Sequence, residues 1–590
     1  MSYNALLRSN NMIRNHEGAV AWMQTPEFEL YSTVVCTMSI DDKFYESASS
    51  RTNRIASLVH MVPAEYVAQL AIYARTEMHL RSVPMLLLVE LSQCHTGDSL
   101  VSRTTSKVIQ RVDDITELLA CYQWRRRTNN LKKLSHQLRR GIAEAFNKFD
   151  EYQFAKYNRN GKNVTLRDAL FLVHPKAKDN TQQTLFDKIA RDELEVPYTW
   201  ETQLSMSGQT KGLAFAERQK LKQKTWKELI ESKRMGYMAM LRNLNNMLSC
   251  GLDELTLQIV FDYLSDEEAV RKSKQLPFRF FTAFLKLNKV DYARYEMLRE
   301  KKKQLMERYY YNKVRKVCRK RLKFKQSSML VAIKKAGISN AGSIAPWHIA
   351  RKRNFRMKQT KVSNHLRKYL DRLDSYLKPS AVNECLESAA KHACSNIPAF
   401  NADTRVCIAC DTSGSMMTDV SNNSIIKCYD LALFFGAMMK HRCPNAVIGM
   451  FADIWLPLKM PQDDIMRNVM EMHSLVGEVG YSTNGHKVIE WLIMNGMVMD
   501  KVMLFTDCQL WNSYSDGTSL SNAWDIYKET IAPDAKLYVF DLAGYGQSPI
   551  DIDTRKDVYS VAGWSDKVFD MLAALENGKS VIDDIRRIVV

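Results

Sequence analysis

Residues 404–417 read TRVCIACDTSGSMM, and this stretch decides the fold class of the C-terminal part of the chain. Its first half is an apolar run that predicts a buried strand ending in Asp411. Further apolar runs follow at 446–452 (AVIGMFA), 501–507 (KVMLFTD) and 535–543 (AKLYVFDLA), with helical patterns between them. Such alternation predicts an α/β domain with a parallel sheet, in which ligands bind at the carboxyl ends of the strands.

Oxygen-bearing side chains follow two of these strands. Asp411, Ser413 and Ser415 alternate in the loop after the first strand, and Asp507 ends a later strand. Thr483 lies between them in a loop flanked by glycines. Carboxylate and hydroxyl oxygens suit Mg²⁺, although an isolated D-x-S-x-S pattern also fits a helix N-cap.

A phosphotransferase or hydrolase that uses Asp411 and Asp507 is the rival interpretation. The sequence has no GxxxxGK[ST] loop, no HExxH and no convincing GxSxG elbow, and no general base stands beside a nucleophile. We therefore expect this protein not to be an enzyme.

The cysteines indicate a reducing cellular compartment and do not indicate a metal site. Cys407 and Cys410 form a CxxC pair on one strand, where residues i and i+3 point to opposite faces and cannot share a metal. The twelve cysteines are irregularly spaced, which is typical of buried thiols in a reducing cytosol. The N-terminus has no apolar signal segment and the chain has no apolar run of ~18 residues, so we expect a cytoplasmic protein without membrane contact.

The first 300 residues consist of successive amphipathic helical patterns. Apolar residues recur with the helical period at 62–94, 135–149, 165–174, 236–248 and 252–264. Because no clear strand interrupts them, these patterns predict an α-solenoid of stacked helix pairs.

Basic residues are concentrated in one segment. The formal net charge of the chain is +19, and residues 301–368 contain 22 Lys or Arg and a single acidic residue, Glu307. Residues 290–325 predict a long basic helix, and the glycines and proline at 337–346 predict a hinge after it. A field of this strength attracts nucleic acid or anionic lipid, and lipid is the weaker choice because a helix lying on a membrane has a broad apolar face.

The set Asp411, Ser413, Ser415, Thr483 and Asp507 resembles the metal-ion-dependent adhesion site of von Willebrand factor A domains. The resemblance covers residues 400–570. It implies that these five residues hold one divalent metal ion, Mg²⁺ by preference, directly or through water. A sixth position would be left for a ligand carboxylate.

Motifs in the helical half resemble the TROVE module of the Ro autoantigen family. They are LRRGIA (138–143), KYNRNG (156–161), LRDAL (166–170), HPK (174–176), MLRNL (240–244) and LPFR (276–279). A TROVE module followed by a von Willebrand A domain is the order found in Ro proteins. The resemblance implies a multidomain fold: a ring of HEAT-like helical repeats over 1–368, closed by a Rossmann-like von Willebrand A domain over 369–590. The basic segment at about 291–368 is an insertion that the family pattern lacks.

The resemblance also implies RNA partners. Ro-like proteins bind small structured non-coding Y RNAs on an outer basic surface, and they take single-stranded 3′ ends of misfolded RNAs into a central hole for RNA quality control. Carried over, the RNA-binding residues are Arg139, Arg140, Lys156, Arg159, His174 and Lys176. The basic segment adds Lys313, Arg315, Lys316, Arg319, Lys320 and Arg321, although its RKVCRKRLK run also fits a nuclear localisation signal, which would allow nuclear shuttling in a eukaryote.

Several of these residues have a plainer interpretation. His174 could cap a helix or pack in the core, and Arg139 and Arg140 could form a solvated or ion-paired helix face. Arg242 lines the hole or forms a buried ion pair. A second hypothesis for the whole chain is a protein-interaction scaffold, in which the metal site recruits a carboxylate of a ribonuclease or another protein.

Overall fold

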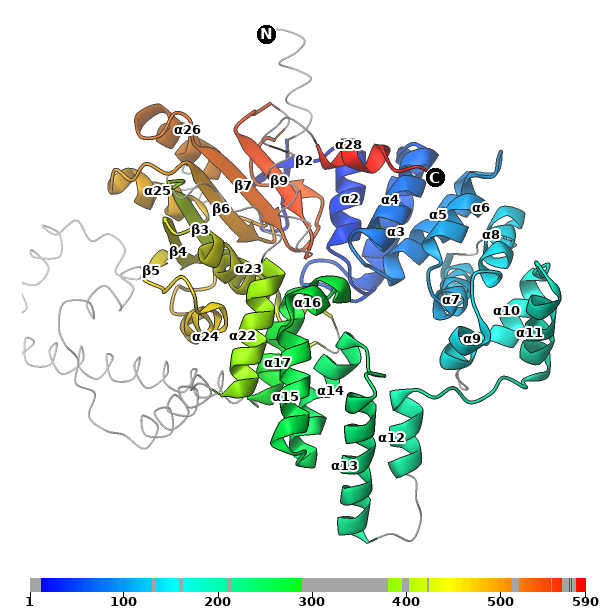
Figure 1. The fold of residues 1–590 in the computed structure, drawn as a ribbon. Coiled ribbons are helices and arrows are strands. Elements are labelled where there is room, and N and C mark those ends of the chain that lie inside the picture. The colour runs from blue at the N-terminus through cyan, green and yellow to red at the C-terminus, as the bar shows by residue number, and fades with distance from the viewer. Residues whose placement is uncertain are drawn as a thin grey trace, which may run out of the picture. The chain divides into compact units, whose positions relative to one another are not determined.

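The computed structural model describes most of the chain outside one long central segment (Figure 1). The described residues are 12–129, 131, 133–158, 163–208, 214–288, 380–394, 403–421, 424–511, 519–552, 554–564, 572, 575 and 580–590. Contacts divide the chain into two compact units, residues 1–284 with 384–590, and residues 285–383. The predicted RNA-binding residues Arg159, Lys313, Arg315, Lys316, Arg319, Lys320 and Arg321, like the predicted basic helix and hinge, lie outside the described residues.

The N-terminal part of the first unit is built from short helices that follow one another closely. They are α2 (Pro26–Val35), α3 (Ala48–Met61), α4 (Ala64–Thr76), α5 (Ser82–Cys94), α6 (Leu100–Val108), α7 (Val112–Asn129), α8 (His136–Phe146), α9 (Glu151–Tyr157), α10 (Leu166–Val173) and α11 (Asn180–Arg191). Polar caps set several starts, such as Asp150 with Gln153 at α9 and Thr165 with Asp168 at α10. The helical prediction is confirmed.

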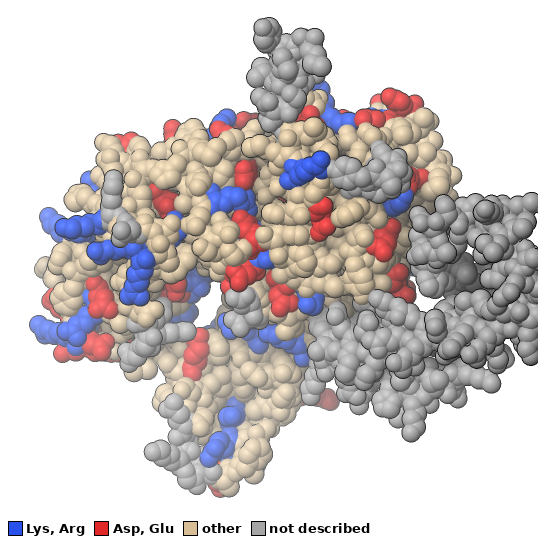
Figure 2. Space-filling model, turned by 180° about the vertical axis from the view of Figure 1, so that it is seen from behind, with Lys and Arg blue, Asp and Glu red and all other residues tan. Residues whose placement is uncertain are grey.

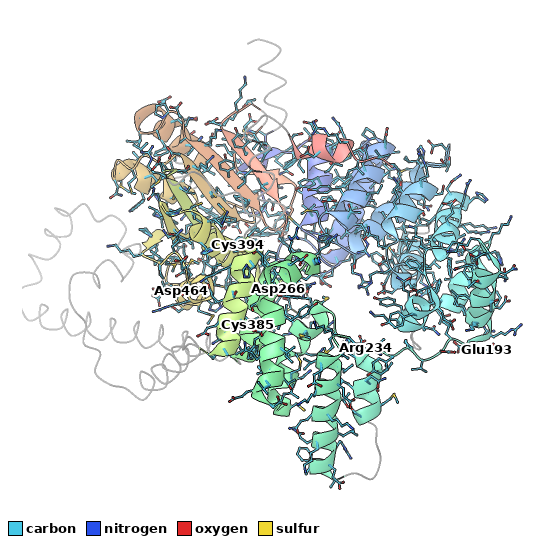
Figure 3. The ribbon with its side chains drawn as sticks, in the orientation of Figure 1. Glu193, Arg234, Asp266, Cys385, Cys394 and Asp464 are labelled. Carbon is cyan, nitrogen blue, oxygen red and sulfur yellow. The ribbon has the colours of Figure 1, made fainter. Side chains whose placement is uncertain are left out.

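A second group of helices continues the same part of the chain. It comprises α12 (Trp200–Gly208), α13 (Phe215–Glu231), α14 (Tyr237–Cys250), α15 (Glu254–Ser265), α16 (Glu267–Ser273) and α17 (Phe278–Leu287). After the central segment, α22 (Ala381–Ala393) lies beside α15, and Cys385 Sγ contacts the carbonyl oxygen of Phe261 at 3.3 Å (Figure 3). No helix in the described part of the chain is long and apolar enough to span a membrane.

The first 300 residues also contain two short strands that the sequence pattern did not indicate. A hairpin of β1 (Met12–Arg14) and β2 (Val20–Met23) precedes the helices. Strand β2 pairs with β8 (Gln547–Ser548) near the C-terminus, which gives a three-stranded sheet of order β1-β2-β8. Two to four residues are too few to show a strand period, so the sequence pattern could not reveal this sheet.

The C-terminal part contains a six-stranded sheet of order β5-β4-β3-β6-β7-β9. The strands are β3 (Val406–Asp411), β4 (Ala446–Phe451), β5 (Trp455–Leu458), β6 (Lys501–Thr506), β7 (Lys536–Asp541) and β9 (Val558–Ala562). The α/β prediction is confirmed, but the sheet is mixed, because β5 runs antiparallel to β4 at one edge. Pro457 in β5 is acceptable there, since an edge strand can lose one backbone donor.

Helices cover both faces of this sheet. They are α23 (Cys428–Arg442), α24 (Ile465–Leu475), α25 (His486–Met494) and α26 (Leu520–Thr530), whereas α28 (Val581–Arg586), near the C-terminus, packs against α4. Cys407 packs with Leu492 and Trp524, whereas Cys410 faces Gly436 of α23. The two thiols therefore point to opposite faces, as predicted, and burial raises the pKa of each.

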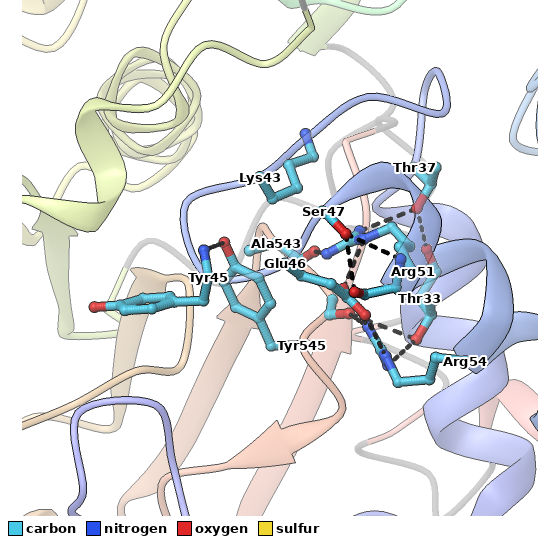
Figure 4. Close-up of polar contacts among 12 residues, drawn as sticks. Thr33, Thr37, Lys43, Tyr45, Glu46, Ser47, Arg51, Arg54, Ala543 and Tyr545 are labelled. Atoms are coloured by element: carbon cyan, nitrogen blue, oxygen red, sulfur yellow. Dashed lines mark hydrogen bonds and ion pairs between the residues drawn. The ribbon is translucent and has the colours of Figure 1, made fainter.

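Two arginines, the buried Arg51 and the partly buried Arg54, join the helices to the α/β part within the first unit. Arg51 donates to the carbonyl oxygen of Ala543 (2.8 Å) and Arg54 to that of Gly544 (2.7 Å), while both pair with Glu46 at 2.9 and 2.8 Å (Figure 4). Arg51 is only 1% exposed. A buried guanidinium with paired and hydrogen-bonded donors holds its surroundings in one geometry, so these contacts fix the α/β part against α3.

Candidate functional site

The predicted metal residues gather at the carboxyl ends of β3 and β6. Asp411 is fully buried, and its two oxygens accept from Ser413 N (2.9 Å) and from Thr506 Oγ1 (2.6 Å). Ser413 Oγ and Ser415 Oγ lie 3.4 Å apart. Because β3 is a central strand beside β6, the loop after β3 brings its oxygens to the same sheet edge as Asp507.

The loop that carries Thr483 is fixed beside this edge. Gly414 N donates to the carbonyl oxygen of Tyr481 at 2.8 Å, which ties the loop to the D-x-S-x-S turn. Gly480 has a φ of +94°, and a Cβ on it would collide with the Asp453 side chain. The Gly480-Tyr481 sequence therefore forms a tight turn around Asp453. Thr483 is buried behind it.

The burial and hydrogen bonding of Asp507 indicate whether these residues could hold a metal ion. It is 2% exposed, its Oδ1 accepts from Gln509 N at 3.0 Å, and its Oδ2 has no hydrogen-bond partner among the described residues. Burial raises the pKa of Asp507, and burial together with the charge of Asp507 raises that of Asp411. Two buried carboxylates with neighbouring hydroxyls form an oxygen donor set that a hard divalent cation would stabilise.

The acidic groups alone do not make a metal centre. Within the described residues, no cluster of three or more His, Cys, Asp or Glu side chains is suited to a metal. A cation here would depend on Asp411 and Asp507 together with the hydroxyls of Ser413, Ser415 and Thr483. The side chains fit Mg²⁺, which retains several water ligands in protein sites.

A second site is a cavity of about 1130 Å³ among the helices. Small-molecule pockets usually measure ~300–1,000 Å³, so this cavity suits a longer or larger ligand. Charged and aromatic side chains on its wall include Arg75, Arg81, Arg111, Asp113, Asp114, Glu117, Tyr152, Lys156, Tyr157, Trp200, Glu201, Arg234, Arg242, Lys274 and Arg279. The space-filling view shows the molecule hollowed between its helical parts, with basic side chains near the opening (Figure 2).

Ion pairs neutralise part of this wall. Asp114 pairs with Arg75 at 2.5 Å, and Asp113 pairs with Arg81 at 2.7 Å and with Arg111 at 2.9 Å. These carboxylates therefore do not offset the charge of the remaining cations. The wall keeps a positive balance on the side of α13, α14 and α17.

The arginines on that side keep their charge available. In the described part of the chain, neither Arg242 nor Arg279 forms an ion pair with an acidic residue. Burial, with a smaller contribution from the charge of Arg242, lowers the pKa of Arg279, so the two guanidinium groups repel each other. Arg234, which lies beside the open space in Figure 3, stacks over Tyr198 at 4.6 Å. Arg242 thus lines the cavity, the first of the two roles that the sequence allowed.

The residues predicted for the outer surface fall into two places. Arg139 and Arg140 are exposed on α8, and Arg140 pairs with Glu144 at 2.9 Å. His174 and Lys176 are exposed; His174 is the left-handed C-cap of α10 (φ 49°), so its backbone caps the helix while its ring remains accessible. Lys156 instead lies on the cavity wall, with its Nζ 5.7 Å from the centre of the Tyr157 ring.

Two domain families match the chain in the expected order. The TROVE domain matches residues 22–203 and 189–348, more than half of the chain, and the Ro60 vWA domain matches residues 405–575. The chain belongs to the TROVE domain family. The resemblance to Ro proteins is confirmed, and the TROVE match extends to residue 348, across the first part of the basic segment.

Individual relatives of this TROVE protein are distant. The telomerase protein component 1 of Mus musculus and that of Rattus norvegicus are each 22% identical to it over 342 residues, which is 44% of this chain but only 13% of theirs. The crystal structure of the Deinococcus radiodurans Ro (RSR) protein matches with a TM-score of 0.52 and 18% identity, covering 94% of this chain and 100% of that one. This likeness shows that the fold is shared.

Membership of the TROVE family implies an RNA partner. The sequence analysis gave no role to Tyr198, Arg234 or Arg279, although Arg279 stands in the LPFR motif. Arg279 lies in the first turn of α17 and Arg234 follows the end of α13, and neither has a periodic sequence pattern of its own, so only the cavity distinguishes them.

Proposed function

We propose that this TROVE protein binds RNA in two ways: single-stranded RNA in the helical cavity and small structured Y-like RNA on the outer surface near α8 and α10. The observation that supports the first part is the set of arginines Arg234, Arg242 and Arg279 on the cavity wall, of which Arg242 and Arg279 have no acidic partner among the described residues and Arg234 stacks over Tyr198. Cations bind phosphates, and aromatic rings beside them stack on exposed bases, which is the usual chemistry of single-strand binding.

The outer surface supports the second part less directly. Arg139, Arg140, His174 and Lys176 are all exposed, so they are accessible to a large ligand. Double-stranded RNA is recognised mainly by its shape and phosphates, for which scattered basic side chains suffice. In this proposal the protein acts in RNA quality control or ribonucleoprotein assembly, by taking the ends of misfolded RNAs in the cavity.

Fluorescence anisotropy with a single-stranded oligouridylate tests the cavity. Arg242→Gln with Arg279→Gln should weaken binding roughly tenfold or more, and should reduce the slope of log affinity against log salt by about 1.4, since each single-strand phosphate contact contributes ~0.7. The matched control is Arg139→Gln with Arg140→Gln, which removes the same charge outside the cavity. Equal losses in the two variants would contradict a cavity site.

A scaffold function is the second candidate, and the strand-end site favours it. A divalent cation held by Asp411, Asp507 and the neighbouring hydroxyls would present an open position to a carboxylate of a protein partner, such as a ribonuclease. Asp411→Ala should then abolish capture of the acidic partner while oligouridylate affinity is unchanged. The proposed activity is binding without catalysis, so RNA incubated with the protein and Mg²⁺ should stay intact.

A further inference from the structure

Helix α10 presents an aromatic side chain to solvent. The buried face of the helix is formed by Leu166, Ala169, Leu170 and Val173. Phe171 lies on the other side of the helix and is 54% exposed, and its neighbour Leu172 is 38% exposed. A single exposed apolar residue is common on protein surfaces and needs no explanation by itself. The groups around Phe171 therefore decide whether this ring has a role.

Arg167 lies over the exposed ring. Its guanidinium carbon is 5.8 Å from the centre of the Phe171 ring, and a spacing of four residues places both side chains on one side of the helix. The adjacent acid, Asp168, is engaged at the start of the helix, where its Oδ2 accepts from Thr165 N (2.9 Å) and Thr165 Oγ1 (2.7 Å). In the described part of the chain Arg167 forms no ion pair, so its charge is available to a phosphate.

The segment after α10 adds further basic and aromatic groups. His174, three residues beyond Phe171, and Lys176 are both exposed. The backbone of this segment is fixed, because Asn147 Nδ2 at the end of α8 donates to the carbonyl oxygen of Lys176 at 2.8 Å. An exposed ring with cations before and after it can stack on a nucleobase while the cations bind phosphates. The same cations make an uncharged apolar partner a poorer fit.

We propose that Phe171 stacks on an unpaired base of a structured RNA, with Arg167 bound to a phosphate beside that base. This inference rests on the proposed function, in which structured RNA binds near α8 and α10. Within a continuous A-form duplex each base face is covered by the next base pair, and only bulges, loops and ends expose unstacked bases. The RNA that fits this surface is therefore a helix interrupted by an unpaired nucleotide.

Fluorescence anisotropy with two blunt-ended RNA duplexes tests the proposal, one with a single bulged uridine and one without it. The full chain should bind the bulged duplex roughly tenfold more tightly, the size expected for one base stacked on an aromatic ring. Phe171→Leu should lose this preference and keep the affinity for the continuous duplex, whereas Phe171→Tyr should keep both. Phe215→Leu is the matched control, because Phe215 on α13 is also exposed, at 82%.

Ultraviolet crosslinking of the bulged uridine gives a second readout. Mass spectrometry should place the crosslink on Phe171 in the wild type and find none there in Phe171→Leu. The stacking role is overturned if the wild type binds both duplexes equally, or if Phe171→Leu keeps the preference for the bulge. Equal binding that Arg139→Gln with Arg140→Gln weakens would remove only the stacking role and leave the outer surface as an RNA site. If the wild type binds neither duplex, the outer-surface part of the proposed function fails as well.

Discussion

Gly480 shows how one residue sets the geometry of the strand-end site. Its φ of +94° belongs to a region that side chains other than glycine rarely adopt, and a Cβ would strike Asp453. Asp453 Oδ1 in turn accepts from the backbone N–H groups of Tyr481 and Ser482 at 3.1 and 2.7 Å. The loop that carries Thr483 therefore depends on this glycine.

We expect Gly480→Ala to destabilise the protein by roughly 1–3 kcal/mol, the usual cost of a strained backbone position. Thermal unfolding measures this effect, and Mn²⁺ titration should show weaker binding in the same variant. Gly97→Ala is the matched control, because nothing lies within 4 Å of a Cβ there. Equal melting temperatures for the two variants would contradict the argument.

Asp430, at the start of α23, is a buried acid outside the metal site. Burial raises its pKa to about 7, despite the hydrogen bond that its Oδ2 accepts from Lys427 N at 2.9 Å. Its Oδ1 lies 3.6 Å from His473 Nε2. A carboxyl whose pKa is raised on folding favours the folded state at low pH, and this contribution is lost as the pH rises through about 7.

Asp430→Asn keeps the acceptor for Lys427 N and removes the titration. The melting temperature of the variant, relative to the wild type, should therefore rise by ~2 °C or more between pH 5 and pH 8, since about 1 kcal/mol corresponds to 2–4 °C in a domain of 150–250 residues. Differential scanning calorimetry at both pH values checks this. A constant difference would mean that Asp430 stays protonated or is fully compensated by His473.

At the scale of elements, the sequence pattern predicted the longer strands and missed the short ones. The six-residue apolar runs of β3, β4, β6 and β7 are long enough to identify, and their order places Asp411 and Asp507 at one edge. The two-residue β8 has no pattern of its own. It pairs with β2, the central strand of the sheet β1-β2-β8, only because distant parts of the chain meet.

The same limit applied to the sites. Asp411, Ser413 and Ser415 form a local motif, so their role could be predicted. A cavity wall, by contrast, has no sequence period, which is why Arg242 was left with two possible roles.

The C-terminal helix α28 should stabilise the fold of the N-terminal helices. Gln69 Nε2 on α4 donates to the carbonyl oxygens of Arg586 (2.8 Å) and Ile588 (3.2 Å), and Val581 and Ile585 are buried. Removing residues 580–590 exposes this apolar contact, so we expect a melting temperature several degrees lower. Arg587→Ala, which changes an exposed side chain at the C-cap of α28, should have little effect.

For the whole molecule, the positive excess comes from one stretch of the sequence. Residues 301–368 contain 22 Lys or Arg and one acidic residue, which accounts for the formal net charge of +19. Deleting them should flatten the salt dependence of RNA binding by several units if their cations contact phosphate. Anisotropy with a structured RNA over a salt series measures the slope. An unchanged slope would exclude these residues from RNA binding.

The pairing of β2 with β8 also means that the three-stranded sheet cannot form until late in translation. Trp22 can pair with Ser548 only after Ser548 has left the ribosome, roughly 500 residues later. At ~5–20 residues per second, the N-terminal hairpin stays without its third strand for about 25–105 s. Throughout that interval its open edge could pair with other nascent chains. We therefore expect a chaperone to protect β1 and β2 until β8 has been synthesised.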